Sequence, residues 1–173
     1  MKQKKSKTIL ISSLFSFLFL VSFTMQAQVF EQGTKFINAG IGFGNRYTLT
    51  NSNAGLPLSA SYEVGVTDKI GVGGFFGYSS SSDPNFNLSY SLIMFGARGA
   101  YHFEVSNDKL DLYGGLILGY YSWSGDTTIS GTSSGLTLGL FGGAHYMFSE
   151  KFGGYAELGY TIAYLNLGVT FKL

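Results

Sequence analysis

Apolar and polar residues alternate strictly through most of the chain after residue 36. In the stretch FGARGAYHF, residues 95–103, the side chains of Phe95, Tyr101 and Phe103 fall on one face, and Arg98 and His102 fall on the other. A period of two is typical of a β-strand with one apolar face. The pattern predicts eight strands. They cover residues 37–43, 58–66, 70–78, 88–103, 110–123, 136–148, 152–162 and 165–173. The alternation is less regular from Leu88 to Met94, which predicts a bulge or a register change near Leu92.

The connections between these strands alternate in length. Short turns are expected near residues 67–69, 104–109 and 148–151, and longer loops near 46–56, 79–87 and 123–134; the last connection, near 162–164, is short. Strands of about ten residues, with short turns at one end and longer loops at the other, are typical of an outer-membrane barrel. Such a sheet has to close, because lipid offers no partner to the backbone groups of an open edge. We therefore predict an all-β, eight-stranded antiparallel up-and-down transmembrane β-barrel.

The first 27 residues have a different pattern. Four lysines precede an apolar run from Thr8 to Phe23, and the short polar segment TMQAQ follows it. This order predicts a secretory signal peptide cleaved after Ala27, with residues 28–173 as the barrel domain. The alternative is an N-terminal membrane anchor, although the run is short for a bilayer span.

Charge and composition narrow the function classes. Without the four signal-peptide lysines, seven Lys and Arg residues remain against ten Asp and Glu residues, so the predicted mature chain has a net charge of about −3. That charge provides no basic face, so we expect no nucleic-acid partner. The chain has no cysteine, which excludes thiolate chemistry. Charged residues make up 12% of the chain, about half the usual share for a globular protein.

The alternation also predicts which face meets lipid. We assign the apolar face to lipid, with five aromatic residues at the membrane interface. They are Tyr101, Phe103, Tyr146, Phe148 and Phe171. A soluble β-sandwich or a lipocalin-like barrel would reverse this assignment, but a water-exposed face would carry more charge than these glycines and serines provide.

The inner face combines glycines with a few large or charged side chains. Arg98, Glu63 and Glu157 are predicted to form a structural charge network in the lumen, because a charge buried there needs a partner. Three other polar residues are assigned to the lumen. They are His102, His145 and Lys172. Eight strands enclose a space that side chains can fill, so we predict no wide aqueous channel.

The stretches GARGAYHF, AELGY and NLGVTFKL resemble the small eight-stranded outer-membrane barrels of the OmpX, OmpW and opacity-protein type. The resemblance implies a monomer in the outer membrane of a Gram-negative cell, with both termini in the periplasm. It implies membrane lipid and the barrel assembly machinery as partners, and no cofactor. Many such chains end on an aromatic residue. This one ends Phe171-Lys172-Leu173, so Phe171 would take that role.

Three functions stay open at this point. The first is a structural or surface-interaction role through Ser-, Thr-, Asn- and Gly-rich loops, with an unknown partner. The second is a conduit for small hydrophobic molecules, suggested by apolar residues on the inner face. They are Leu88, Tyr90, Leu92 and Met94. The third is a lipid-modifying enzyme, but neither histidine has a serine two residues away on its face, so we predict no catalytic residue, no metal site and no enzyme.

Overall fold

The computed structural model describes residues 28–45, 53–83, 88–125 and 134–173. The predicted signal peptide lies outside these residues and stays a prediction. Within the described part of the chain, no helix has the length and apolar character needed to cross a membrane.

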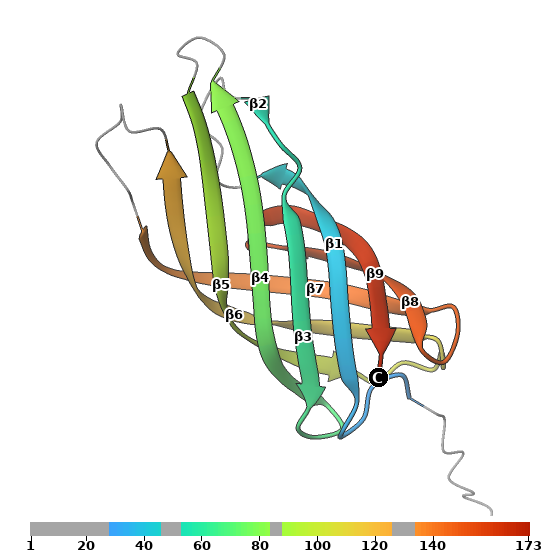
Figure 1. Cartoon of the computed structure of the whole chain (residues 1–173). Coiled ribbons are helices and arrows are strands. Elements are labelled where there is room, and N and C mark those ends of the chain that lie inside the picture. The colour runs from blue at the N-terminus through green and yellow to red at the C-terminus, as the bar shows by residue number, and fades with distance from the viewer. Residues whose placement is uncertain (1–27, 46–52, 84–87, 126–133) are drawn as a thin grey trace, which may run out of the picture.

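In the described residues, nine antiparallel strands form one closed sheet (Figure 1). They are β1 (Lys35–Asn45), β2 (Asn53–Ala54), β3 (Leu58–Gly65), β4 (Ile70–Asp83), β5 (Leu88–Phe103), β6 (Leu110–Gly125), β7 (Ser134–Met147), β8 (Phe152–Gly159) and β9 (Ala163–Lys172). Eight of them pair around the ring in chain order, and β1 closes the ring by pairing with β9. The two-residue β2 pairs with the end of β4 and continues the position of β3. The predicted eight-stranded antiparallel barrel is therefore confirmed.

The barrel has two different ends. At one end, which we call the turn end, lie the connections 66–69, 104–109 and 148–151, together with Gln28 and Leu173. At the opposite end, which we call the loop end, β1, β4, β6 and β8 end and β5, β7 and β9 begin, and residues 160–162 join β8 to β9 there. The five predicted interface aromatics are all exposed on the outer wall near the turn end. Tyr101 and Phe103 have ring centroids 5.2 Å apart, and those of Tyr146 and Phe148 are 5.8 Å apart.

The outer wall is apolar and the inner face is polar or small. On β7, Leu136 and Leu138 are 78% and 72% exposed, whereas Thr137 between them is buried. This is the reverse of a soluble barrel, and lipid is the surrounding that suits it. Inside, glycines make room for large side chains: a Cβ on Gly143 would lie 2.8 Å from the Tyr113 hydroxyl, and one on Gly71 would lie 2.6 Å from Glu63 Oε1.

The strands at the loop end are longer than the alternation predicted. β4 continues through Asp83, so residues 79–83 of the predicted loop belong to a strand. β4 and β5 pair without interruption from Ile70 opposite Tyr101 to Asp83 opposite Leu88. The predicted bulge near Leu92 is therefore wrong. The serines keep the period of two, with Ser79 and Ser81 buried. A run of serines shows no alternation of apolar and polar residues, however, so the sequence pattern did not indicate a strand here.

Ile162 is a second correction. The alternation placed it on the outer face, with the predicted strand reaching residue 162. β8 ends at Gly159, and the turn that follows directs Ile162 into the lumen, where it is 2% exposed. The Thr161 hydroxyl donates a hydrogen bond to the Ala163 carbonyl oxygen at 3.2 Å and so stabilises this turn. Once the strand ends, the period of two no longer decides which way a side chain points.

Candidate functional site

A cluster of charged side chains lies inside the barrel. Arg98 on β5, Glu63 on β3 and Glu157 on β8 meet there, each with a side chain less than one-tenth exposed. Arg98 Nη2 donates a hydrogen bond to Glu157 Oε2 at 3.0 Å. Arg98 Nε lies 3.3 Å from Glu63 Oε2, an ion-pair distance without hydrogen-bond geometry. The three residues assigned to a lumen network thus lie together.

The strand register explains how these residues meet. Glu63 stands opposite Gly73 on β4, and Gly73 stands opposite Arg98 on β5. The residue between the two charges therefore has no side chain, and the long arginine can reach across the glycine to the carboxylate. The Arg98 guanidinium carbon also lies 4.2 Å from the centroid of the Phe141 ring, a cation–π distance that offsets part of the cost of burial.

Two histidines extend the cluster towards the turn end. His102 Nε2 lies 2.8 Å from Glu63 Oε1, and His102 Nδ1 lies 2.8 Å from Asp111 Oδ1. His145 Nδ1 lies 2.8 Å from Asp111 Oδ2. Both nitrogens of His102 thus face carboxylate oxygens, and only the doubly protonated imidazole can donate from both. His102 and His145 both point into the lumen, where the alternation had assigned them.

Asp111 was not singled out in the sequence, yet it bridges both histidines. It falls on the inner face by parity and stands directly opposite His145 in the pairing of β6 with β7. The contact of Asp111 with both histidines could therefore be recognised only once the strand register was known. With Asp111 included, the described part of the lumen holds three buried carboxylates, of Glu63, Asp111 and Glu157, together with Arg98, His102 and His145.

A segment that precedes β1 closes the turn end of the lumen. Val29 and Phe30 are buried there together with Phe36 and Met147. The Phe30 ring lies parallel to the imidazole of His102, with centroids 3.4 Å apart and an interplanar angle of 2°. Lys172, which was assigned to the lumen, is half-buried at this end, and its Nζ donates a hydrogen bond to the Val29 carbonyl oxygen at 2.8 Å.

An apolar layer fills the lumen on the other side of the charged cluster. Leu92 and Met94 pack with Ile162 and Ala163, and all four are buried. Three half-buried aromatic residues surround them. They are Phe75, Tyr121 and Trp123. Of the other residues suggested for a conduit, Tyr90 lies nearer the loop end beside an open hollow, and the Leu88 side chain lies outside the described part of the structure.

The side chains inside the barrel can neutralise one another's charges and fill the lumen. In the part of the chain that the structure describes, no three His, Cys, Asp or Glu residues are placed to hold a metal ion. At the turn end, outside the strands, Lys69 Nζ lies 2.8 Å from Glu104 Oε1. The hydrogen bond to this carboxylate, and then its negative charge, raise the pKa of the Lys69 ammonium.

Comparison with known proteins places this geometry in a family. OprG of Pseudomonas aeruginosa superposes with a TM-score of 0.63 at 12% identity, over 86% of this chain and 98% of that one. Neisserial surface protein A gives a TM-score of 0.54 at 16% identity, over 81% of this chain and 96% of that one. The N-terminal β-barrel domain of Pseudomonas aeruginosa OprF gives 0.51 at 19% identity, over 83% and 99%.

At these identities the solved structures show a shared fold alone. A search among curated proteins gives no match to this chain. Residues 15–171, however, match the sequence family described as the outer membrane protein beta-barrel domain. The chain therefore belongs to this family of outer-membrane β-barrels.

Proposed function

We propose that this protein is a barrel closed by its own side chains, which acts at the cell surface through its loop end. The observation that carries the proposal is the filling of the lumen at three successive levels. Phe30 and Phe36 close the turn end, Arg98 and its partners cross the middle, and Leu92 and Ile162 fill the level beyond.

Each level opposes the passage of a solute for a physical reason. A hydrated ion would have to displace buried apolar side chains at the first and third levels, which removes their packing contacts. At the middle level it would have to compete with ion pairs in a space of low dielectric constant. An eight-stranded barrel has an interior that side chains alone can fill, in keeping with this description.

The orientation in the membrane is part of the same proposal. Short turns in outer-membrane barrels lie in the periplasm, and longer loops lie outside the cell. The turn end would therefore face the periplasm with both termini. Leu173 is held there by a backbone hydrogen bond from its N–H to the Lys35 carbonyl oxygen, 3.0 Å long. Membrane lipid around the wall, and assembly machinery that contacts the exposed Phe171, are the partners we infer for a monomeric barrel.

The two other functions receive less support from the contacts. A lateral conduit at Leu92 and Met94 needs a gap in the wall beside them, whereas β4 and β5 are paired along that whole region. A hydrolytic enzyme needs an imidazole nitrogen free to activate a hydroxyl. In His102 both nitrogens face carboxylates and the ring face is covered by Phe30. His145 Nε2 has no hydrogen-bond partner, but the side chain is fully buried and its ring packs against those of Phe36 and Tyr113, so a substrate has no access to it.

Conductance across a planar lipid bilayer tests the proposal. The purified barrel should give no steady open channel, whereas a variant with Phe30→Ala, Arg98→Ser and Ile162→Gly, which removes a large side chain at each of the three levels, should conduct. Cell fractionation and a shift between boiled and unboiled samples on SDS gels would establish that both proteins are folded barrels in the outer membrane. Steady conductance by the unmodified protein would refute the closed lumen.

A further inference from the structure

Three strands project beyond the apolar wall at the loop end. On the outer face of β4, Phe76 and Tyr78 are followed by Ser80 and Ser82. The five residues from 79 to 83 extend this strand by about 16 Å beyond Tyr78, at about 3.3 Å per residue. The outer faces of β5 and β6 change in the same way. There, serines 89 and 91 continue from Ile93, and serines 122 and 124 continue from Tyr120.

The register brings these serines side by side. Ser80 stands opposite Ser91, Ser91 stands opposite Ser124, and Ser82 stands opposite Ser89. Directly paired positions have Cβ atoms about 5 Å apart, so the hydroxyls form a compact array rather than isolated groups.

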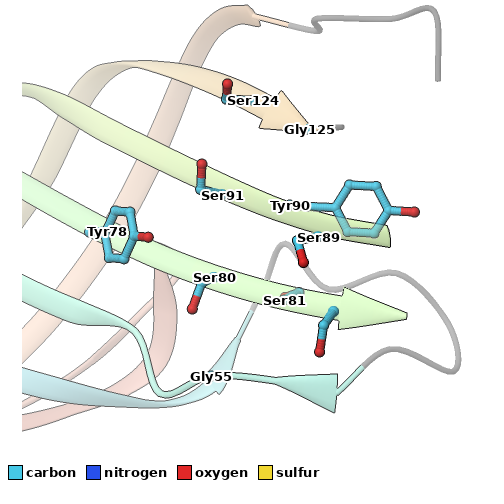
Figure 2. Close-up of a pocket in the computed structure, with 10 residues that line it drawn as sticks. Gly55, Tyr78, Ser80, Ser81, Ser89, Tyr90, Ser91, Ser124 and Gly125 are labelled. Atoms are coloured by element: carbon cyan, nitrogen blue, oxygen red, sulfur yellow. The ribbon is translucent and has the colours of Figure 1, made fainter. Parts of the chain in front are cut away.

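This array lines an open hollow of about 590 Å³. Figure 2 shows the hydroxyls of Ser91 and Ser124 pointing the same way in the view, the Ser80 hydroxyl pointing the other way, and the rings of Tyr78 and Tyr90 at opposite ends of the group. Gly55, beside Ser80, completes the lining without a side chain. The described lining residues are all serine, tyrosine or glycine, and none carries a charge at neutral pH.

The chemistry of this lining selects a class of ligand. A serine hydroxyl donates one hydrogen bond and accepts others, as a sugar hydroxyl does. Tyrosine supplies rigid, amphipathic contact area, and serine and glycine supply adaptable hydrogen bonding, the combination found in antibody binding loops. An anionic ligand would lack a cationic partner in the hollow, and a protein would lack the cluster of buried apolar anchors that dominates protein interfaces.

The position of the hollow selects the source of that ligand. Most of its lining residues, among them Ser80, Ser82 and Ser124, lie on the outer face of the strands, directly beyond the level at which apolar side chains give way to serine, whereas Ser81 and Tyr90 fall on the inner face. A sugar joined to a lipid in the same leaflet lies at this level. We propose that the outer-face part of the hollow, formed by Ser80, Ser91, Ser124 and Tyr78, binds the neutral sugar headgroup of a membrane glycolipid. This inference rests on the proposed function, since it takes the loop end to lie at the cell surface.

The test uses the whole barrel in nanodiscs of phosphatidylcholine mixed with digalactosyl diacylglycerol. Native mass spectrometry counts the lipids that stay on the protein when it leaves the disc. We expect the unmodified barrel to retain the glycolipid at least about tenfold over phosphatidylcholine, a ratio that corresponds to roughly 1.4 kcal/mol. Ser91→Trp, which fills the hollow, should remove this preference.

Two controls keep the result specific. Ser134→Trp makes the same change at an exposed outward position of β7 that does not line the hollow, and it should retain the preference. Ser80→Trp is a second blocking variant in case Ser91→Trp does not fold, and the shift between boiled and unboiled gel samples shows which variants fold.

Four outcomes would overturn the inference. They are equal retention of both lipids, a preference for anionic lipid, a preference that survives both blocking variants, and free digalactose binding as tightly as the glycolipid. A protein occupant of the hollow would give the first of these. In each case the conductance measurement is independent of lipid binding. A barrel that does not conduct would still support the proposed closed lumen, so failure of the glycolipid site can be distinguished from failure of the proposed function.

Discussion

Replacement of Arg98 by methionine is the most direct test of the charged cluster. The change preserves much of the side-chain volume but removes the cation that contacts both Glu63 and Glu157. Both carboxylates are buried, so they lose a partner in a region away from bulk water. Breaking a buried ion pair by removing one partner costs about 3–5 kcal/mol, and the lost contact with the Phe141 ring adds to this. We therefore expect Arg98→Met to lower the free energy of unfolding by about 3–5 kcal/mol.

The assay is urea unfolding of the barrel in lipid vesicles, followed by far-UV circular dichroism and by gel mobility. Glu157→Gln and the double variant Arg98→Met/Glu157→Gln complete a mutant cycle. Because the two residues share a hydrogen bond of 3.0 Å, their coupling energy should reach about 1–3 kcal/mol.

A loss below about 1 kcal/mol for Arg98→Met would refute this reasoning, because such a value is typical of exposed pairs. Coupling near zero would mean that the two residues are close without stabilising one another.

Three further predictions concern Phe30 at the turn end of the lumen, the glycines of the wall and a leucine on the outer wall. Phe30→Ala should destabilise the barrel by about 3 kcal/mol in the same urea assay, because it empties a buried site, and a loss below about 1 kcal/mol would show that this segment does not close the lumen. Gly143→Ala should cost about 1–3 kcal/mol because the new methyl group would lie 2.6 Å from the Ala156 carbonyl oxygen and 2.8 Å from the Tyr113 ring, whereas Gly142→Ala, where the nearest atom is 3.7 Å away, should stay within about 0.5 kcal/mol; equal effects would contradict the inside–outside assignment. Leu116→Arg should cost about 2–4 kcal/mol in vesicles, as expected for a lipid-facing position near the bilayer centre, while Ser124→Arg should change the stability little; the reverse order would place the apolar band wrongly.

Much of the architecture was predictable because a strand that separates lipid from a packed lumen imposes a period of two on its own residues. Arg98 and Glu157 could be assigned to the lumen in this way, since each is flanked by residues of opposite character. The same signal missed features that lack contrast. The serine extension of β4 was read as a loop because serine suits either state, and Ile162 was assigned to the outer face because the end of β8 leaves no mark in the alternation.

The alternation by itself determined that this chain forms strands, which face of each strand meets lipid, and which side chains enter the lumen. Only the tertiary structure decided which of those side chains touch. Asp111 joins His102 to His145 because the register of β6 with its neighbours brings them to one level, and Phe30 reaches His102 from a segment that has no periodicity at all. The period of two shows whether each residue of a strand faces lipid or the lumen. Which side chains contact one another across the barrel depends on the strand register and on barrel closure. Both are set by the pairing of strands that lie far apart in the sequence.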